Sequence, residues 1–508
     1  MKRLYISYYK IWRHNCVKNG FPTSNQTAQT ENSSESKLKV FALFTATFFA
    51  VIFAAIFAVT FAINLQNLTA QETKPDNQSE RPRDRIGQNN DERRGGEGRG
   101  EGRGEGRGGE GRGEGRGEGR GGRGGRGGEG RGGFSELESK PVAAPVQVAP
   151  LSAEERSSKL KTAKEKAISF LRDKQVANGS WAASPRSGIG PTAVILTGLL
   201  NCGVKPDDPM IKKGLTFLEA SIKKDGGIYS SAHFQNYETS VALLAFAAAN
   251  KLIKSENKNK PPYDALLANA EKALRGQQYI EERNVNKDDP RYGGIGYGGE
   301  TRPDLSNTQF FLDALKAAGK NADDPAIQKA LVFVSRNQNL ESEYNKLPFA
   351  SKNPDGGFIY TSTTGSSSAG TTESGGLRSY ASMTYAGLKS MIYAGLTKDD
   401  KRVKAAYEWI TKNYSVVENP GMGQRGLFYY YHTMSKALGV MGENQIVDAN
   451  GKKHDWKTEL TDQLLSYQRT DGAWINDKSA QWMENDPHLV TGFVLLVLAE
   501  CAKSNKGE

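Results

Sequence analysis

RPDLSNTQFFLDAL, residues 302–315, joins a polar start to an apolar segment that begins at Thr308. Leu312 and Leu315 follow this threonine by four and seven residues, which is the spacing of one face of a helix. Five similar segments begin at Thr192, Thr239, Thr384, Thr433 and Thr491. The chain therefore contains six predicted helices that share one register.

A further predicted helix precedes each of these six, and a turn joins the two. In four copies the turn places Asn or Asp before Gly and ends on an apolar or aromatic residue: 178–181, 225–228, 355–358 and 471–474. Glycine permits a left-handed backbone there, and the Asn or Asp side chain can close the turn. One helix pair cannot bury both its helices, so the pairs must stack on one another, as an open solenoid or a closed ring.

Three other segments precede the repeats, which occupy residues 151–503. Residues 1–39 are polar and basic, and residues 40–65 contain a charge-free apolar run. As a helix, this run would span about 34 Å, enough to cross a bilayer. It is longer than the apolar part of a cleaved signal peptide, the competing interpretation, so we predict an uncleaved anchor. Basic residues concentrate before the run, which predicts a cytoplasmic N-terminus and a repeat domain outside the cytosol, in the periplasm or at the cell exterior.

Residues 66–150 form a predicted disordered linker, rich in Gly, Arg and Glu and containing Pro near its end. An arginine-glycine segment can bind nucleic acid through phosphate contacts. In residues 81–133, glutamates interleave with the arginines and no aromatic residue is interspersed to stack on bases. We therefore predict a flexible spacer and no nucleic-acid partner. Because of this segment, the formal net charge of +11 says little about the repeats.

Six helix pairs with a Gln and a turn of the form (Asp/Asn)-Gly-x-(Trp/Phe) resemble the repeats of squalene and terpenoid cyclases and of protein prenyltransferase β subunits. The resemblance implies an all-α fold, an α6/α6 toroid. It also implies that the starts of the six Thr-led helices, the second helix of each pair, surround a mostly apolar cavity. An isoprenoid-like ligand would occupy such a cavity.

The chemistry of the class II cyclases depends on an Asp-x-Asp-Asp-Thr motif, whose acid protonates an alkene. The matching segment here is Asp304-Leu305-Ser306-Asn307-Thr308, with serine at the position of the proton donor. A serine hydroxyl cannot protonate an alkene, which is a very weak base. Asp304 is therefore expected mainly as a helix cap and only weakly as a catalyst.

The chemistry of the prenyltransferases depends on zinc held by Asp, Cys and His. The segment 430–433, Tyr-Tyr-His-Thr, resembles the part that carries their zinc-binding histidine, but the Asp-x-Cys ligands have no counterpart. We therefore predict no metal and no other cofactor. Cys202 and Cys501 each lie ten residues after a threonine, in the first and last repeats. Residues of equal phase on neighbouring helices do not point at each other, which disfavours a disulfide between them.

Polar and aromatic residues near the helix starts are the candidate site. Glu238, Asn307 and His432 each directly precede a register threonine, where they line a shared rim or cap their own helices. The aromatic candidates for holding an isoprenoid, or for stabilising a carbocation, are Tyr237, Phe310, Phe311, Tyr385, Phe428, Tyr429, Tyr431 and Trp482. Aromatic residues at helical spacing are also typical of an ordinary core. The insertion 361–376 is either a lid or a surface loop.

Two function classes follow. The missing proton donor and zinc ligands favour a membrane-anchored, degenerate member that binds a hydrophobic, isoprenoid-like ligand or a protein partner. The alternative is an active terpenoid cyclase or prenyltransferase-type enzyme with a non-standard acid. Its weak candidates for catalysis are Asp304, Glu238 and His432.

Overall fold

The computed structural model describes residues 146–181, 187–256 and 263–503. The predicted segments 1–39 and 40–65 and nearly all of the predicted linker lie outside these ranges. Within them, no helix combines the length and the apolar character needed to cross a membrane.

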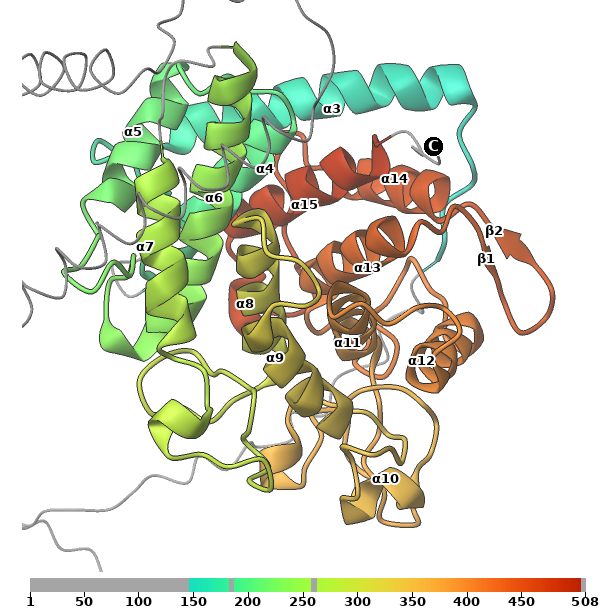
Figure 1. The fold of residues 1–508 in the computed structure, drawn as a ribbon. Helices are drawn as coiled ribbons and strands as arrows, with labels where there is room; N and C mark the ends of the chain where they lie inside the picture. The colour runs from blue at the N-terminus through green and yellow to red at the C-terminus, as the bar shows by residue number, and fades with distance from the viewer. Residues whose placement is uncertain (1–145, 182–186, 257–262, 504–508) are drawn as a thin grey trace, which may run out of the picture. The chain divides into compact units, whose positions relative to one another are not determined.

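Six pairs of longer helices follow one another in the described ranges (Figure 1). The first helices of the pairs are α3 (Ala153–Lys174), α5 (Pro209–Glu219), α7 (Asp264–Arg275), α9 (Pro325–Arg336), α12 (Lys401–Lys412) and α14 (Trp456–Tyr467). The Thr-led helices are α4 (Gly190–Asn201), α6 (Gln235–Glu256), α8 (Leu305–Ala317), α11 (Ala381–Tyr393), α13 (Leu427–Met441) and α15 (Pro487–Cys501). The prediction of a helical fold built from helix pairs is confirmed. The other elements in the described ranges, which belong to no helix pair, are the short α10 (Pro348–Lys352), four 3₁₀ turns and a hairpin of β1 (Ile446–Val447) and β2 (Lys453–His454).

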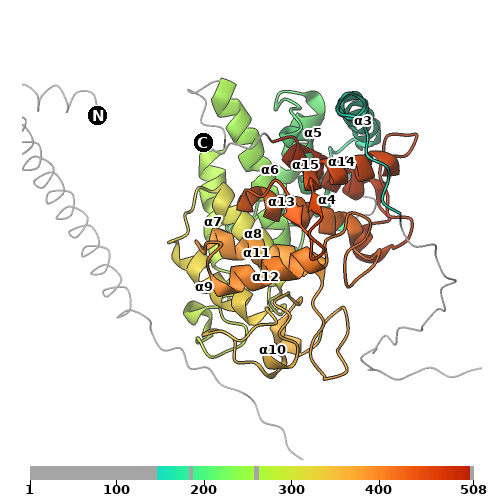
Figure 2. The same ribbon diagram turned by 90° about the vertical axis from the view of Figure 1, so that its right-hand side faces the viewer.

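The Thr-led helices form the buried layer. Each packs against the next in chain order, and the last, α15, packs against the first, α4 (Figure 1; Figure 2). In α4, every residue except Asn201 is buried, and in α8 both Leu305 and Leu315 are fully buried. The first helices are amphipathic and bury one face against this layer, as α9 does with Ile327, Val334 and their neighbours.

The register threonines have a structural task that explains their recurrence. In five pairs, the threonine hydroxyl accepts a hydrogen bond from the backbone N–H of the residue that ends the preceding turn. These bonds join Trp181 to Thr192, Ile228 to Thr239, Ile295 to Thr308, Phe358 to Thr384 and Trp474 to Thr491, at 3.0–3.2 Å. The exception is Thr433, which donates to the Tyr430 carbonyl of its own helix. The threonine thus fixes each turn on the helix that follows it.

A glutamine after four of the first helices links one pair to the next. Its Nε2 donates both to the carbonyl of the turn glycine and to a carbonyl of the next first helix; the four are Gln175, Gln278, Gln338 and Gln468. The second acceptor of Gln468 is Ala163 of α3, at 2.9 Å. The last pair is therefore hydrogen-bonded to the first.

One turn of this kind was not predicted. Gly293 has a φ of +81°, and a Cβ there would lie 1.9 Å from the Lys329 carbonyl oxygen. Only glycine fits at this position without displacing the backbone of α9.

The two described cysteines are free thiols. The Cys202 thiol donates to the Leu495 carbonyl at 3.3 Å. Burial raises the pKa of Cys202 to about 11 and that of Cys501 to about 12, so both are inert at neutral pH.

Candidate ligand-binding site

The starts of the Thr-led helices surround a cavity of about 340 Å³, here called the aromatic cavity. This volume lies within the range of about 300–1,000 Å³ found for small-molecule sites. Much of the wall is aromatic, with Tyr237, Phe310, Tyr360, Tyr380, Tyr429 and Trp482 among its residues. Of the residues predicted from the sequence, the structure brings together in this wall Tyr237, Glu238, Phe310, Tyr429 and Trp482.

The buried carboxylate of Glu238 is held from two sides. One oxygen, Oε1, accepts from the Ile189 N–H at 2.8 Å, and the other, Oε2, accepts from the Ser230 N–H at 2.5 Å and from the Ser230 hydroxyl at 2.8 Å. These bonds tie the start of α4 to the segment before α6. Glu238 therefore has a structural task in addition to its place in the cavity wall.

Glu484 is the second buried carboxyl group of the aromatic cavity. Its Oε1 accepts from the Tyr429 N–H at 2.8 Å, and its Oε2 accepts from Asn476 Nδ2 at 2.7 Å. It thereby caps α13, which lacks a capping side chain because Gly426 stands at the N-cap. Burial raises the pKa of Glu484 to about 7, although the hydrogen bonds from Asn476 and Tyr429 act in the opposite direction. Near neutral pH, Glu484 is therefore present in both protonation states.

Asp304 is the N-cap of α8. Its two oxygens accept from the backbone N–H and the side-chain Nδ2 of Asn307, both at 2.8 Å. Both residues are buried and lie outside the lining of the aromatic cavity. Burial raises the pKa of Asp304 to about 6, and the neighbouring Tyr360, which does line the cavity, lowers it. The catalytic role considered for Asp304 stays a prediction.

Ser306, at the position of the absent acid, belongs to a set of hydrogen-bonded side chains that we call the polar chain. Its hydroxyl lies 2.8 Å from the Tyr429 hydroxyl, which also accepts from Gln309 Nε2 at 3.0 Å. Gln309 in turn accepts from Lys389 Nζ, and Lys389 forms an ion pair of 2.5 Å with Asp313. The polar chain ends at Tyr393, whose hydroxyl donates to Asp313 at 3.0 Å.

The sequence analysis missed Lys389 and Asp313, although a signal was available. Each lies five residues after its register threonine, Thr384 or Thr308, in an otherwise apolar segment. A charged side chain in a buried, otherwise apolar helix requires a partner of opposite charge, and both of these side chains are almost completely buried.

The remaining sequence candidates lie elsewhere. His432 lines a second cavity and lies between Phe310 and Phe493, with ring centroids 6.2 Å and 5.7 Å away. Burial lowers the pKa of His432 to about 3, so its imidazole is neutral. Phe311, Tyr385 and Tyr431 are buried in the core and line neither cavity. Glu238, Asn307 and His432 thus do not form one rim.

No metal centre is evident in the described ranges, where no group of three or more His, Cys, Asp or Glu side chains is placed to hold an ion. His432, the residue that resembles a zinc ligand, has aromatic rings on both sides.

Comparisons with known proteins concern the fold. No protein-family model matches the sequence, and no curated protein matches it in a sequence comparison. Among solved structures, the chain is similar to the type II terpene cyclase MstE from Scytonema. An apo structure of a variant of MstE is 13% identical, covers 68% of this chain and 98% of its own, and has a TM-score of 0.44.

A second MstE structure, a variant in complex with geranylgeranyl dihydroxybenzoate as substrate, is 14% identical over 69% of this chain and 99% of its own, with a TM-score of 0.41. A structure described as a novel alpha-amylase from Clostridium perfringens is 12% identical over 66% of this chain and 97% of its own, also with a TM-score of 0.41. The cyclases are of the class that the repeats were predicted to resemble. These similarities assign neither an activity nor a ligand to this chain.

Proposed function

We propose that this chain is a membrane-anchored binding protein whose helical domain holds a small hydrophobic ligand with a polar end in the aromatic cavity. The observation that carries the proposal is the combination of an aromatic wall with the buried carboxyl group of Glu484. The rings supply apolar contact area, and the carboxyl group, with a pKa of about 7, exchanges a hydrogen bond with the polar end in either protonation state.

The fold that we propose for this domain is the α6/α6 toroid. Two observations support it. The Thr-led helices contact one another in an unbroken series from α4 to α15 and back to α4. The bond from Gln468 to Ala163 joins the first helices of the last and first pairs in the same way.

Binding without catalysis is favoured by the acids at the site. Ser306 stands where a proton donor would be, and its hydroxyl is engaged with Tyr429. The carboxyl groups of Asp304 and Glu484, with pKa values of about 6 and 7, are weak acids for protonating an alkene.

A second candidate function is a cyclase that uses Glu484 as its acid. One observation favours it: Glu484 lines the aromatic cavity and is largely protonated below pH 7. The surrounding rings would then stabilise a carbocation through their π faces.

Lipid extraction and mass spectrometry of the purified full-length chain test the proposal. The wild type should retain a hydrophobic molecule. Met383→Trp, which fills part of the aromatic cavity, should lose it, whereas Val447→Trp on the exposed β1 strand should retain it. If no lipid or isoprenoid is retained, and none binds when added, the proposal fails. Chemical conversion of a bound isoprenoid that stops in Glu484→Gln would establish the second candidate instead.

The membrane location rests on the charge-free run in residues 40–65 and on the basic residues before it. Carbonate washing of membranes from expressing cells should leave the full-length chain in the pellet. Release into the supernatant would contradict an integral anchor.

A further inference from the structure

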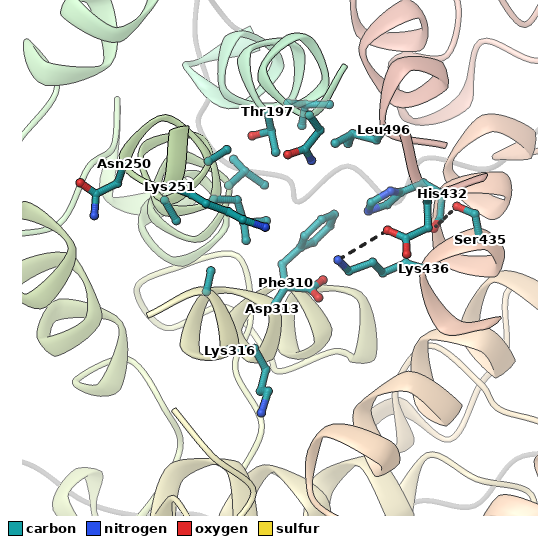
Figure 3. Close-up of a pocket in the computed structure, with 18 of the residues that line it drawn as sticks. Thr197, Asn250, Lys251, Phe310, Asp313, Lys316, His432, Ser435, Lys436 and Leu496 are labelled. Carbon is teal, nitrogen blue, oxygen red and sulfur yellow. Dashed lines mark hydrogen bonds and ion pairs between the residues drawn. The ribbon is translucent and has the colours of Figure 1, made fainter. Parts of the chain in front are cut away.

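The second cavity, about 700 Å³, lies among the later turns of the Thr-led helices (Figure 3). Phe310 and Phe493 line both cavities and therefore stand between them. We call the second one the lysine cavity because five lysines line it: Lys251, Lys254, Lys316, Lys436 and Lys503. Nothing in the proposed function above makes use of it.

The charge of the lysine cavity is positive. Only two carboxylates are among its lining residues, and both already have cationic partners. Asp313 pairs with the buried Lys389 at 2.5 Å, and Glu500 pairs with Lys503 at 2.6 Å. Asp264, outside the lining, pairs with Lys254 at 2.7 Å, and the five lysines still exceed the negative charge available to them.

Two of these lysines are placed to share an anion. In Figure 3, the ammonium groups of Lys251 on α6 and Lys436 on α13 extend into the cavity from opposite sides, with the Phe310 side chain drawn between them. Lys251 has no carboxylate within ion-pair distance among the residues that the structure describes, and Lys436 lies 3.9 Å from Glu500, which has a closer partner in Lys503. In the described ranges, each of these two ammonium groups therefore lacks a close carboxylate partner of its own, and an anion in the cavity would supply one.

Stabilisation of helix C-termini does not account for these two residues. Lysines in a last turn interact favourably with the helix dipole, and Lys254 and Lys316 hold such positions in α6 and α8. Lys251 and Lys436 precede the last turns of their helices.

The other part of the cavity wall is apolar, with Val194, Val241, Leu244, Leu267 and Leu496 beside the two phenylalanines. An occupant that satisfies both parts has a hydrocarbon body and an anionic head. We propose that the lysine cavity binds an amphipathic anion, whose phosphate or carboxylate head lies between Lys251 and Lys436.

Calorimetric titration of the full-length chain in maltoside micelles tests this site, with titrations into micelles alone subtracted. The probes are octyl phosphate and octanoate, which distinguish the two kinds of head, and octanol and inorganic phosphate, which each lack one part. At least one of the first two should bind about tenfold more tightly than octanol or inorganic phosphate. Its affinity should also fall as salt is added.

Lys251→Met and Lys436→Met should each weaken binding of that probe roughly tenfold. Lys346→Met, which changes an exposed lysine outside the described cavities, should leave binding unchanged. Equal binding of octanol, or affinity unaltered by both cavity substitutions, would overturn the proposal. Loss of the probe in Met383→Trp but not in Lys251→Met would also overturn it, because the probe would then occupy the aromatic cavity. Circular dichroism of each variant confirms that the comparison is made on folded protein.

Discussion

The ion pair between Lys389 and Asp313 is the feature whose disruption should change the stability of the helical domain most. The Lys389 side chain is completely buried, and 6% of the Asp313 side chain is exposed. Truncating one partner leaves the other as an unpaired buried charge, which typically costs about 3–5 kcal/mol. Lys389→Met is therefore expected to lower the free energy of unfolding by this amount, although methionine retains most of the apolar stem.

The corresponding change in melting temperature follows from the size of the domain. At about 2.1 cal/mol/K per residue over roughly 350 residues, the entropy of unfolding is about 0.7 kcal/mol/K, so Lys389→Met should lower the Tm by about 4–7 °C. In the double variant with Asp313→Leu, no charge is left unpaired, and only Gln309 and Tyr393 lose a partner, at about 1 kcal/mol each. The double variant should therefore melt above either single variant.

Thermal unfolding of the full-length chain, followed by circular dichroism at 222 nm, measures these shifts. The matched control is Lys398→Met, which removes an exposed ion pair with Glu443 and should change the free energy of unfolding by less than about 1 kcal/mol. The reasoning is refuted if Lys389→Met melts no lower than this control. It is equally refuted if the double variant is less stable than both single variants.

Three further predictions concern single side chains. Burial raises the pKa of Glu484 from 4.5 to about 7, so the free energy of unfolding of the wild type should fall by up to about 3 kcal/mol as the pH rises from 4.5 to 7. Urea unfolding measures this pH dependence, and Glu484→Gln should remove it. An unchanged pH dependence in the variant would contradict the raised pKa of Glu484. Burial lowers the pKa of His432 from 6.5 to about 3, so the wild type should lose stability as the pH falls from 6.5 to 3. In urea unfolding over these pH values, His432→Phe should lose less stability than the wild type. Thr384→Val leaves the Phe358 N–H without its acceptor and should cost about 1–3 kcal/mol, whereas Thr433→Val, which removes no such bond, should cost clearly less; equal losses would contradict the proposed task of the threonine.

The helix pairs could be predicted because their causes are local. The apolar spacing after each threonine and the Asn/Asp-Gly turns are both visible in a short window of sequence. The turn at Gly293 escaped because Tyr292, instead of Asn or Asp, precedes the glycine. Glycine is needed there because the Lys329 carbonyl of α9 lies where a Cβ would be. A contact between segments so far apart in the chain cannot be recognised in a short window of sequence.

The lining of the site was harder to predict, because a helix turns about 100° per residue. Of the aromatic residues predicted together, Phe310 and Tyr429 face the aromatic cavity, whereas Phe311 and Tyr431, one and two residues away, lie in the core. Aromatic identity gives no information about which side a ring faces.

His432 differs from Asn307 for a related reason. Both directly precede a register threonine, but α13 begins at Leu427, six residues before its threonine, and α8 begins at Leu305, three before its own. His432 therefore lies almost one turn further along its helix and reaches the lysine cavity. Two residues that directly precede their threonines therefore lie at different distances from the starts of their helices when those helices begin at different points.

The polar chain connects the walls of the two cavities. Ser306 opens onto the aromatic cavity and Asp313 onto the lysine cavity, and the residues between them are hydrogen-bonded without a gap. Phe310 and Phe493 line both cavities, so a ligand that passed from one cavity to the other would have to displace at least one of these rings. Ser306, at the position that the resemblance gives to an acid, is thus the first member of a hydrogen-bonded chain that joins the walls of the two cavities.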